Sequence, residues 1–182
     1  MACTDRSVNE QNRELLKLWG FHTDASDAVV AGIARGLKSA FPYNRPVLSH
    51  PALTFEPLYF FFYGSLQARK TLVRVCGLED ENPTLIPASI KGWKMMMWGA
   101  YPALVPQEGN EVKGMCWKCE DPEHINNLKW YETEAYRMER CKITTNEGEV
   151  IENGRIFVAS GTKELSEGAF DLEAYIDHYG NI

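Results

Sequence analysis

The sequence lacks the features of several large classes of protein. It has no Lys/Arg run long enough to follow a nucleic-acid backbone, and its net charge is −6, so we expect no nucleic-acid partner. No apolar run approaches the roughly 18 to 20 residues that a membrane helix needs, so no membrane partner is expected either. The first residues also lack the basic-then-apolar pattern of a signal peptide. We therefore expect a cytoplasmic protein.

Common motifs of metal, redox and nucleophilic enzymes are missing as well. The four histidines are far apart and form no HxxxH or HExxH pattern, and neither GxGxxG nor GxSxG occurs. The five cysteines are scattered, which suits reduced thiols better than a disulfide framework. Cys116 and Cys119 have CxxC spacing, but no second CxxC or His pair completes a set of zinc ligands. We expect no metal and no cofactor.

The composition that remains is that of a globular protein with one sizeable core. Of the 182 residues, 45% are hydrophobic and 24% are charged, and the 12% of aromatics indicates bulky packing. This length fits one domain with room for an appendage. We predict an N-terminal helical extension over residues 1–50 and a main domain over residues 51–182. The oligomeric state is left open.

The N-terminal region has the pattern of amphipathic helices. Residues 7–19 carry several apolar side chains, and residues 24–41 repeat them at spacings of three and four. Asp24 or Ser26 is a suitable cap for this second helix, and Pro42 ends it. Its apolar stripe favours packing on the main domain, with docking on a partner as the alternative.

After residue 57 the pattern changes to short apolar segments separated by Gly, Pro and Asn. Helices are predicted over residues 66–78, 121–132 and 170–179, and Pro122 suits the first turn of the second of these. Interspersed helices without regular βαβ alternation favour an α+β fold, a small mixed β-barrel or sheet with flanking helices. Strands are predicted over residues 58–63, 90–98, 112–118, 136–145 and 155–159.

The most informative local feature is an aromatic strand that ends at a glycine. Residues 58–63 are apolar or aromatic, and Gly64 and Ser65 follow them directly. A glycine lets a ligand approach the main chain and leaves N–H groups to bind a carboxylate or phosphate. An ordinary turn is the alternative interpretation, because many strands end in Gly-Ser turns.

Five short motifs follow one another between residues 58 and 160. They are Tyr63-Gly64-Ser65-Leu66, Tyr101-Pro102-Ala103-Leu104-Val105-Pro106, Val112-Lys113-Gly114, Leu128-Lys129-Trp130-Tyr131-Glu132 and Tyr136-Arg137. This ordered series resembles the gamma-glutamylcyclotransferase-like family, and residues 1–50 lie outside the resemblance. The resemblance implies a compact mixed β-barrel with flanking helices. It also implies a site in which the 63–66 loop binds the α-carboxylate and amine end of a γ-glutamyl group, with Glu132 as the acid/base.

In the implied reaction, the α-amino group of a γ-glutamyl amide attacks its own γ-carbonyl and gives 5-oxoproline and a free amine. The nucleophile belongs to the substrate, so the enzyme has to position the substrate and move protons. Glu132 is the candidate for both proton transfers, and Glu134 is a weaker second candidate. We expect the amides of Gly64, Ser65 and Leu66 to bind the carboxylate. An apolar pocket that raises the pKa of Glu132 is expected from Tyr63, Tyr101, Trp130 or Tyr136, and Tyr136 could add a hydroxyl hydrogen bond.

The chain departs from the family pattern beside the candidate acid. The family usually reads Leu-Asp-x-x-Glu-Gly, whereas this chain has Lys129 for the Asp and Thr133 for the Gly. These changes keep the base and alter the turn after it. The substrate is therefore open among glutathione, a γ-glutamyl amino acid, a γ-glutamyl-lysine crosslink and a γ-glutamyl-protected intermediate of a specialised pathway.

Two other functions fit the same residues. The first is a same-fold enzyme that catalyses proton transfer or ring formation on another small metabolite. The second is a non-catalytic binding module that docks through the helix predicted over residues 24–41. A fold alone does not decide among these functions, because sites change on retained scaffolds.

Overall fold

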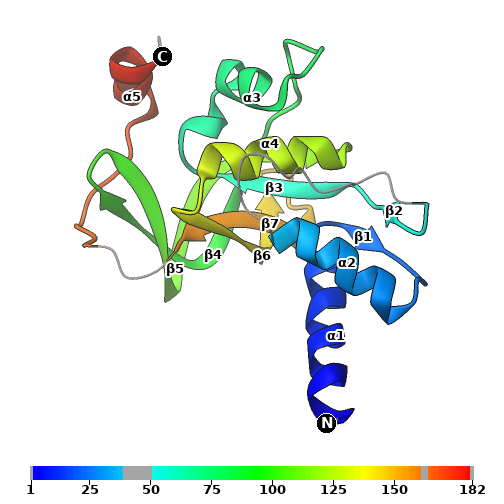
Figure 1. Ribbon diagram of the computed structural model, residues 1–182. Helices are drawn as coiled ribbons and strands as arrows, with labels where there is room; N and C mark the ends of the chain where they lie inside the picture. Colours follow the sequence, from blue (N-terminus) through cyan, green and yellow to red (C-terminus); the bar gives the residue numbers. More distant parts are fainter. Residues whose placement is uncertain (1, 39–50, 161–163, 181–182) are drawn as a thin grey trace.

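The computed structural model describes residues 2–38, 51–160 and 164–180, and a closed five-stranded barrel is its central element (Figure 1). Around the barrel the strand order is β3-β5-β4-β6-β7. Neighbouring strands are antiparallel except β3 and β7, whose parallel pairing closes the barrel. The predicted mixed barrel is thus confirmed. The strands are β3 (Leu58–Phe62), β4 (Ile86–Trp98), β5 (Tyr101–Cys119), β6 (Tyr136–Thr145) and β7 (Val150–Ala159).

Strands β4 and β5 form a long hairpin that extends well beyond the predicted strands. Their register runs from Ile86 opposite Cys116 to Trp98 opposite Tyr101. Residues 101–106, which were predicted only as a motif and not as a strand, are therefore part of β5. The tip of the hairpin carries two large exposed side chains, since Trp98 is 38% exposed and Tyr101 is 46% exposed.

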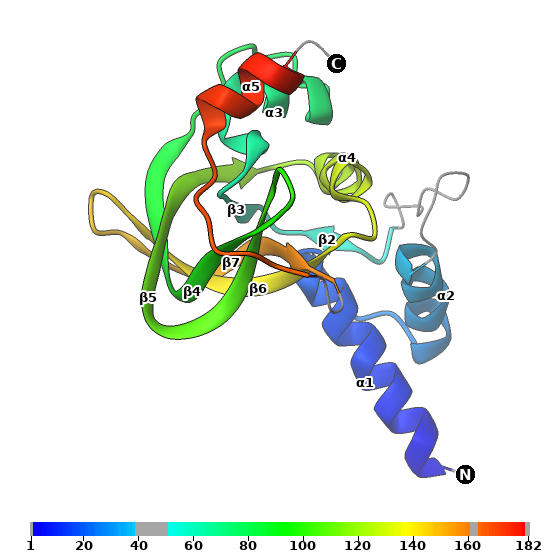
Figure 2. The ribbon, with the colours of Figure 1, turned by 90° about the vertical axis from the view of Figure 1, so that its left-hand side faces the viewer.

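Two helices lie over one side of the barrel, as Figures 1 and 2 both show: α3 (Arg69–Cys76) and α4 (Pro122–Glu132). Helix α4 begins as the sequence predicts. Asp121 accepts a hydrogen bond from the amide of Glu123 (2.8 Å), and Pro122 occupies the first turn. The helix predicted over residues 66–78 is instead a 3-10 turn (Ser65–Gln67) followed by α3, because Ala68 between them is extended.

The other elements flank this centre. Helix α1 (Ala2–Leu18) projects away from the barrel, with α2 (Asp27–Lys38) beside its C-terminal part (Figures 1 and 2). A short two-stranded sheet, β1 (Phe21–His22) with β2 (Thr54–Phe55), was not predicted. Helix α5 (Leu172–Tyr179) ends the described chain.

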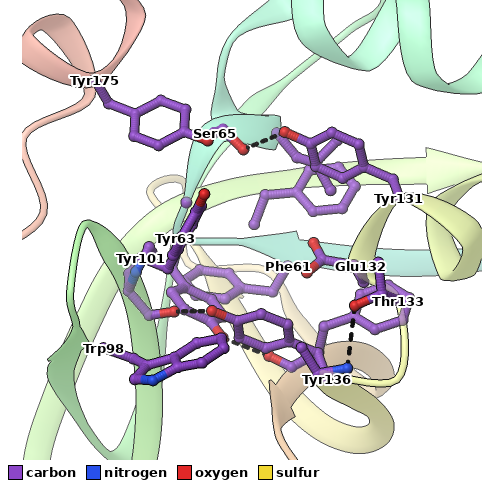
Figure 3. A pocket seen from close by; sticks show the side chains of 16 residues that line it. Phe61, Tyr63, Ser65, Trp98, Tyr101, Tyr131, Glu132, Thr133, Tyr136 and Tyr175 are labelled. Carbon is purple, nitrogen blue, oxygen red and sulfur yellow. Dashed lines mark hydrogen bonds between the residues drawn. The ribbon is translucent and has the colours of Figure 1, made fainter. Parts of the chain in front are cut away.

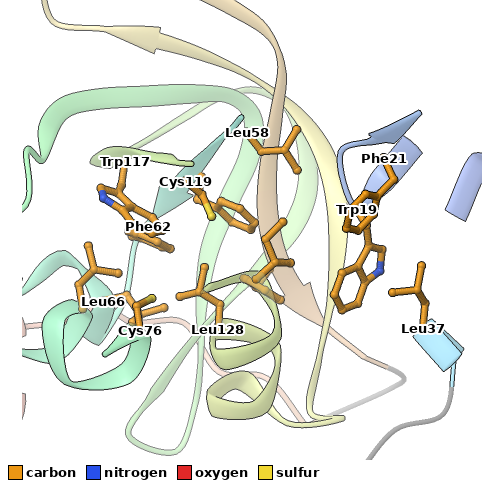
Figure 4. Packing of buried hydrophobic residues seen from close by; sticks show 14 of the residues in the cluster. Trp19, Phe21, Leu37, Leu58, Phe62, Leu66, Cys76, Trp117, Cys119 and Leu128 are labelled. Atoms are coloured by element: carbon orange, nitrogen blue, oxygen red, sulfur yellow. The ribbon is translucent and has the colours of Figure 1, made fainter. Parts of the chain in front are cut away.

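The N-terminal helices and the barrel share one hydrophobic core (Figure 4). Trp19 and Phe21 after α1, and Leu37 on α2, belong to the same buried cluster as Leu58 of β3 and Leu128 of α4. The stripe predicted over residues 24–41 therefore packs on the main domain as far as the structure describes it. Phe41 and Pro42 lie outside the described residues, and the division of the chain at residue 50 stays a prediction.

A buried arginine joins the barrel to the end of α1. Arg155 of β7 is fully buried, and its guanidinium donates hydrogen bonds to the carbonyls of Lys17 (2.9 Å) and Leu18 (2.6 Å). It also donates to the carbonyls of Asn153 (2.8 Å) and Gly154 (3.1 Å) and to the Asn153 side chain (2.8 Å). Burial lowers the pKa of Arg155 to about 10. Carbonyls at a helix C-terminus carry partial negative charge, so this cation suits the end of α1.

The cysteines of the CxxC spacing lie buried in β5 with free thiols. Burial raises the pKa of Cys116 to about 12, and it raises the pKa of Cys119 as well. Across residues 2–38, 51–160 and 164–180, no cluster of His, Cys, Asp and Glu is arranged to hold a metal ion. Within the same residues, no helix is both long and apolar enough to cross a bilayer.

Candidate functional site

A pocket of about 470 Å³ lies between the 63–66 loop, the end of α4, the tip of the β4–β5 hairpin and α5 (Figure 3). Of the sixteen described residues that line it, nine are aromatic. The structure brings together in this pocket seven of the residues proposed for the site, which are Tyr63, Gly64, Ser65, Leu66, Tyr101, Glu132 and Tyr136.

Glu132 is the last residue of α4, and its carboxyl group points into the pocket (Figure 3). Burial raises the pKa of Glu132 to about 8, and no cation within residues 2–38, 51–160 and 164–180 offsets this effect. A carboxyl group with a pKa near the working pH can both accept and return a proton. The structure thus gives Glu132 the environment that general acid/base chemistry requires.

Two other residues near Glu132 lie outside the pocket. Glu134, the second candidate acid, is exposed and is not among the lining residues. Trp130 is 63% exposed and does not line the pocket, so its predicted place in the pocket wall was wrong. Successive helical residues point about 100° apart. Because Tyr131 and Glu132 face the pocket, the preceding Trp130 is turned toward solvent.

The 63–66 loop lines one part of the pocket. Within the part of the chain that the structure describes, the amides of Gly64, Ser65 and Leu66 donate to no protein acceptor. The next two amides do have partners, since Gln67 and Ala68 donate to the carbonyls of Gly64 and Ser65 (3.1 Å each). Three adjacent amides beside a pocket are suited to bind a carboxylate.

Hydrogen bonds between tyrosines and their neighbours fix the pocket wall. The buried hydroxyl of Tyr63 donates to the carbonyl of Phe157 (2.6 Å), and the hydroxyl of Tyr136 donates to the carbonyl of Pro102 (2.9 Å). Burial, reinforced by the negative charge of Glu132, raises the pKa of both phenols, so they stay protonated. The proton of Tyr136 therefore holds the hairpin in this structure.

A third pair links the loop to α4. The hydroxyl oxygens of Ser65 and Tyr131 lie 2.8 Å apart, and either can be the donor. Tyr131 precedes Glu132 on α4, so this bond ties the loop to the turn of helix that carries the candidate acid (Figure 3). The contact between Ser65 and Tyr131 thus helps to fix the position of the loop relative to Glu132.

Thr133 has a backbone conformation that favours glycine. Its φ is 58° and its ψ is −165°, and it is the one non-glycine residue with positive φ among the described residues. This conformation turns the chain between Glu132 and Tyr136, and the Thr133 hydroxyl accepts a hydrogen bond from the amide of Ala135 (3.1 Å). A β-branched residue is strained there by about 1 to 3 kcal/mol. Strain of this kind is common at functional sites.

We expect the usual order of stability of alanine and glycine variants to reverse at position 133. Neither Thr133→Ala nor Thr133→Gly keeps the hydroxyl, so their difference isolates the backbone strain. At an ordinary helix or strand position glycine is less stable than alanine by about 0.5 to 1 kcal/mol. Here we expect Thr133→Gly to be the more stable variant by about 1 kcal/mol in urea denaturation. The opposite order would mean that the turn relaxes out of the positive-φ region.

Lys129, the other departure from the family pattern, contacts the N-terminal helices. The ammonium group of Lys129 donates to the carbonyl of Leu37 (3.2 Å) and lies 5.1 Å from the centre of the Trp19 ring. Burial lowers the pKa of Lys129. Lys129 thus contacts α2 and the end of α1, and it is not among the residues that line the pocket.

Several pocket residues were not predicted. Tyr131 stands beside Glu132 in a motif, and its position on the same helical turn could have indicated it. Trp98, Phe157 and Tyr175 come from the hairpin tip, β7 and α5, and no local pattern marks them. Long-range contacts bring them together, including the pairing of Met97 with Ser166, whose backbone hydrogen bonds (2.8 and 2.9 Å) hold the C-terminal segment against the hairpin.

Residues 60–175 match the model of a family described as gamma-glutamyl cyclotransferase, AIG2-like. The fold is similar to the solution structures of two Arabidopsis thaliana proteins. The first is 16% identical, with a TM-score of 0.55, over 70% of this chain and 78% of that one. The second is 20% identical, with a TM-score of 0.54, over 70% of this chain and 86% of that one.

A solved structure of a gamma-glutamyl cyclotransferase is 18% identical, with a TM-score of 0.50, over 60% of this chain and 70% of that one. No curated protein sequence matches the chain. At these identities the structural likeness establishes the fold and leaves the chemistry to the site.

Proposed function

Because the chain belongs to the gamma-glutamyl cyclotransferase, AIG2-like family, we propose that it is a cofactor-independent gamma-glutamyl cyclotransferase. Its reaction converts a γ-glutamyl amide into 5-oxoproline and a free amine. The observation that carries the proposal is that Glu132 and the 63–66 loop, whose amides of residues 64–66 have no acceptor among the described residues, line one pocket. These are the two groups that the reaction needs, a proton carrier and an anion-binding site.

The reaction balances without water or an added reactant. The α-nitrogen of the substrate forms a bond to the γ-carbon, and the bond from that carbon to the amide nitrogen breaks. A substrate bound as its ammonium form loses two protons from the attacking nitrogen, and the departing amine gains two. Glu132 as carboxylate takes one proton from the attacking nitrogen and returns it to the departing one, and a second round of the same transfer moves the other proton.

In this proposal the 63–66 loop fixes the substrate for ring closure. The amides of Gly64, Ser65 and Leu66 bind the α-carboxylate, which places the adjacent α-amino group near Glu132. Holding the γ-glutamyl group in a bent conformation places its α-nitrogen close to its γ-carbonyl, in a geometry near that of attack. The bond between Ser65 and Tyr131 supports this arrangement, because it keeps the loop and the end of α4 together.

A second candidate function is proton transfer or ring formation on another small metabolite, and it rests on the aromatic lining of the pocket. The binding-module hypothesis has less support. A module without catalysis gives no reason for a carboxyl group that faces a pocket and has a pKa raised by burial.

The proposed function is tested by incubating the wild-type protein with a panel of γ-glutamyl compounds. The panel holds glutathione, γ-glutamyl-alanine, γ-glutamyl-ε-lysine and γ-glutamyl-tyramine. We expect equal molar amounts of 5-oxoproline and free amine, measured by liquid chromatography with mass detection. Release of no 5-oxoproline from any of these compounds would overturn the proposal.

We expect Gly64→Ala to lower kcat/KM by about 10-fold or more, mainly through a higher KM. A Cβ atom at position 64 would lie 3.1 Å from Cγ of Pro102, whose carbonyl accepts the Tyr136 hydroxyl bond. The loop or the hairpin must therefore shift. Gly32→Ala is the matched control, since its added Cβ meets nothing within 4 Å. Equal kinetics of the two variants would exclude a binding role for the loop.

A further inference from the structure

One side of the pocket is made of aromatic rings from the tip of the β4–β5 hairpin and from α5. Trp98 and Tyr101 belong to the hairpin tip and Tyr175 belongs to α5. Their rings are in contact, with centroid distances of 6.1 Å between Trp98 and Tyr101 and 6.3 Å between Tyr101 and Tyr175. In Figure 3 these three side chains lie across the pocket from Glu132. We call this set the aromatic side of the pocket.

The aromatic side is held in place by further contacts. The Tyr175 ring packs on Phe170 (5.3 Å between centroids) and on Tyr179 (4.9 Å). The backbone pairing of Met97 with Ser166 fixes the segment before α5 against the hairpin. The rings therefore form a defined surface beside the reacting groups, and an aromatic group of a ligand has partners there for stacking.

The described lining of the pocket carries one charged side chain, and that side chain is acidic. Among its sixteen described lining residues, Glu132 is the single side chain of the Asp, Glu, Lys, Arg and His types. Burial is the cause of its raised pKa, and no cation among the described residues lowers it. A second carboxylate brought into this pocket would be desolvated without a counter-charge and would repel the ionised form of Glu132.

The main-chain donors of the pocket are already assigned under the proposed function. The three amides of the 63–66 loop hold the α-carboxylate of the γ-glutamyl group. A carboxylate on the departing amine would need its own donors or a cation. The aromatic side offers rings, together with hydroxyl groups on Tyr101 and Tyr175.

Resting on the proposed function, we propose that the departing group is an aromatic amine that carries no carboxylate, and that Trp98, Tyr101 and Tyr175 form its subsite. The amine of such a substrate is an arylalkylamine or arylamine in amide linkage to the γ-carboxyl group of glutamate. Its ring lies against the aromatic side while its nitrogen lies near Glu132.

A matched pair of substrates tests the absence of a carboxylate. γ-Glutamyl-tyramine and γ-glutamyl-tyrosine differ only by the carboxylate of the departing group. We expect kcat/KM for 5-oxoproline release to be at least about 10-fold higher for the tyramine compound. Equal or reversed values would overturn the inference and leave the proposed function standing. Release from neither compound, nor from any other γ-glutamyl compound of the panel, would overturn the proposed function and this inference with it.

Comparison with an aliphatic amide tests the role of the rings. We expect Trp98→Ala and Tyr175→Ala each to lower kcat/KM for γ-glutamyl-tyramine by about 10-fold, and for γ-glutamyl-propylamine by about 2-fold or less. A defect of folding would reduce both substrates alike, so the ratio between them reports the subsite. Trp130→Ala is the matched control, because this tryptophan is exposed on α4 outside the pocket. An unchanged ratio in both pocket variants would overturn the assignment.

Discussion

Glu132→Gln is expected to lower the rate of 5-oxoproline release by about 10²- to 10⁴-fold, the range typical of a lost general acid/base. Glutamine has nearly the same shape and keeps a hydrogen-bonding carbonyl, so substrate binding should change little. The carboxylate is what accepts the proton of the substrate ammonium, and an amide cannot do so. Steady-state kinetics with γ-glutamyl-tyramine, followed by mass detection, measure the effect.

The matched control is Glu134→Gln, which removes an exposed carboxylate two residues away. We expect its rate to stay within about 2-fold of wild type. The wild-type kcat/KM should rise with pH as Glu132 ionises, since its pKa is about 8, and Glu132→Gln should lose this limb of the profile. A Glu132→Gln variant as active as Glu134→Gln would contradict the assigned role.

The same substitution has an expected effect on stability that depends on pH. Burial raises the pKa of Glu132 from an ordinary value of 4.5 to about 8, so between these values the folded protein binds more protons than the unfolded chain. Stability from this group therefore falls as pH rises from about 4.5 to 8. The glutamine of Glu132→Gln does not titrate. We therefore expect the free energy of unfolding of this variant, relative to that of the wild type, to increase by about 2 to 4 kcal/mol between pH 5 and pH 8.5 in urea denaturation. A pH-independent difference would contradict the raised pKa.

Arg155→Met is expected to cost about 3 kcal/mol or more of unfolding free energy. The guanidinium of Arg155 is fully buried and satisfies the carbonyls of Lys17, Leu18, Asn153 and Gly154. Methionine fills similar space but donates none of these hydrogen bonds. The carbonyl of Lys17 keeps the amide of Gly20 as a donor (3.0 Å), whereas each buried acceptor left without a donor costs about 1 to 3 kcal/mol. The attachment of α1 to β7 should weaken most. Urea denaturation measures the loss, and earlier proteolysis within α1 reports its location.

Arg140→Met is the control for this substitution. Arg140 lies on the neighbouring strand, and its bond to Glu14 (3.2 Å) joins two side chains that are about half exposed. Exposed ion pairs contribute about 1 kcal/mol or less. Loss of similar stability in both variants would show that the buried hydrogen bonds of Arg155 add nothing beyond a surface contact.

Most of the barrel was predictable because its strands carry local patterns. The aromatic run at Leu58–Phe62 and the strand Tyr136–Thr145 are both near their predicted places. The first half of β5 was missed, since the exposed residues 107–109 are polar or small and interrupt the apolar pattern, and they lie at the register shift opposite Lys91 and Trp93 of β4. The start of β7 was missed for the same reason, because residues 150–153 are largely exposed.

The residues of the site also divide into those that local motifs predict and those that only the tertiary structure brings together. Residues within the motifs, such as Gly64, Glu132 and Tyr136, were predicted, because each motif places its residues together along the chain. Trp130 was placed wrongly because a linear motif does not say which neighbour a helix turns outward. Trp98 and Tyr175 were missed, since they enter the pocket through the packing of the hairpin on the C-terminal segment. The aromatic side is thus a property of the tertiary structure alone.

The parallel pairing of β3 with β7 has a consequence for the order in which the chain folds. Strand β3 is made first among the barrel strands, and both of its partners, β5 and β7, come from the far part of the chain. The bond from Tyr63 to Phe157 spans 94 residues. Contacts of such high sequence separation form slowly, and the run Tyr59-Phe60-Phe61-Phe62 stays uncovered until the ribosome has delivered β7. The nascent chain therefore carries this aromatic segment, which leads into the 63–66 loop of the pocket, without its β7 partner until residue 159 has been added.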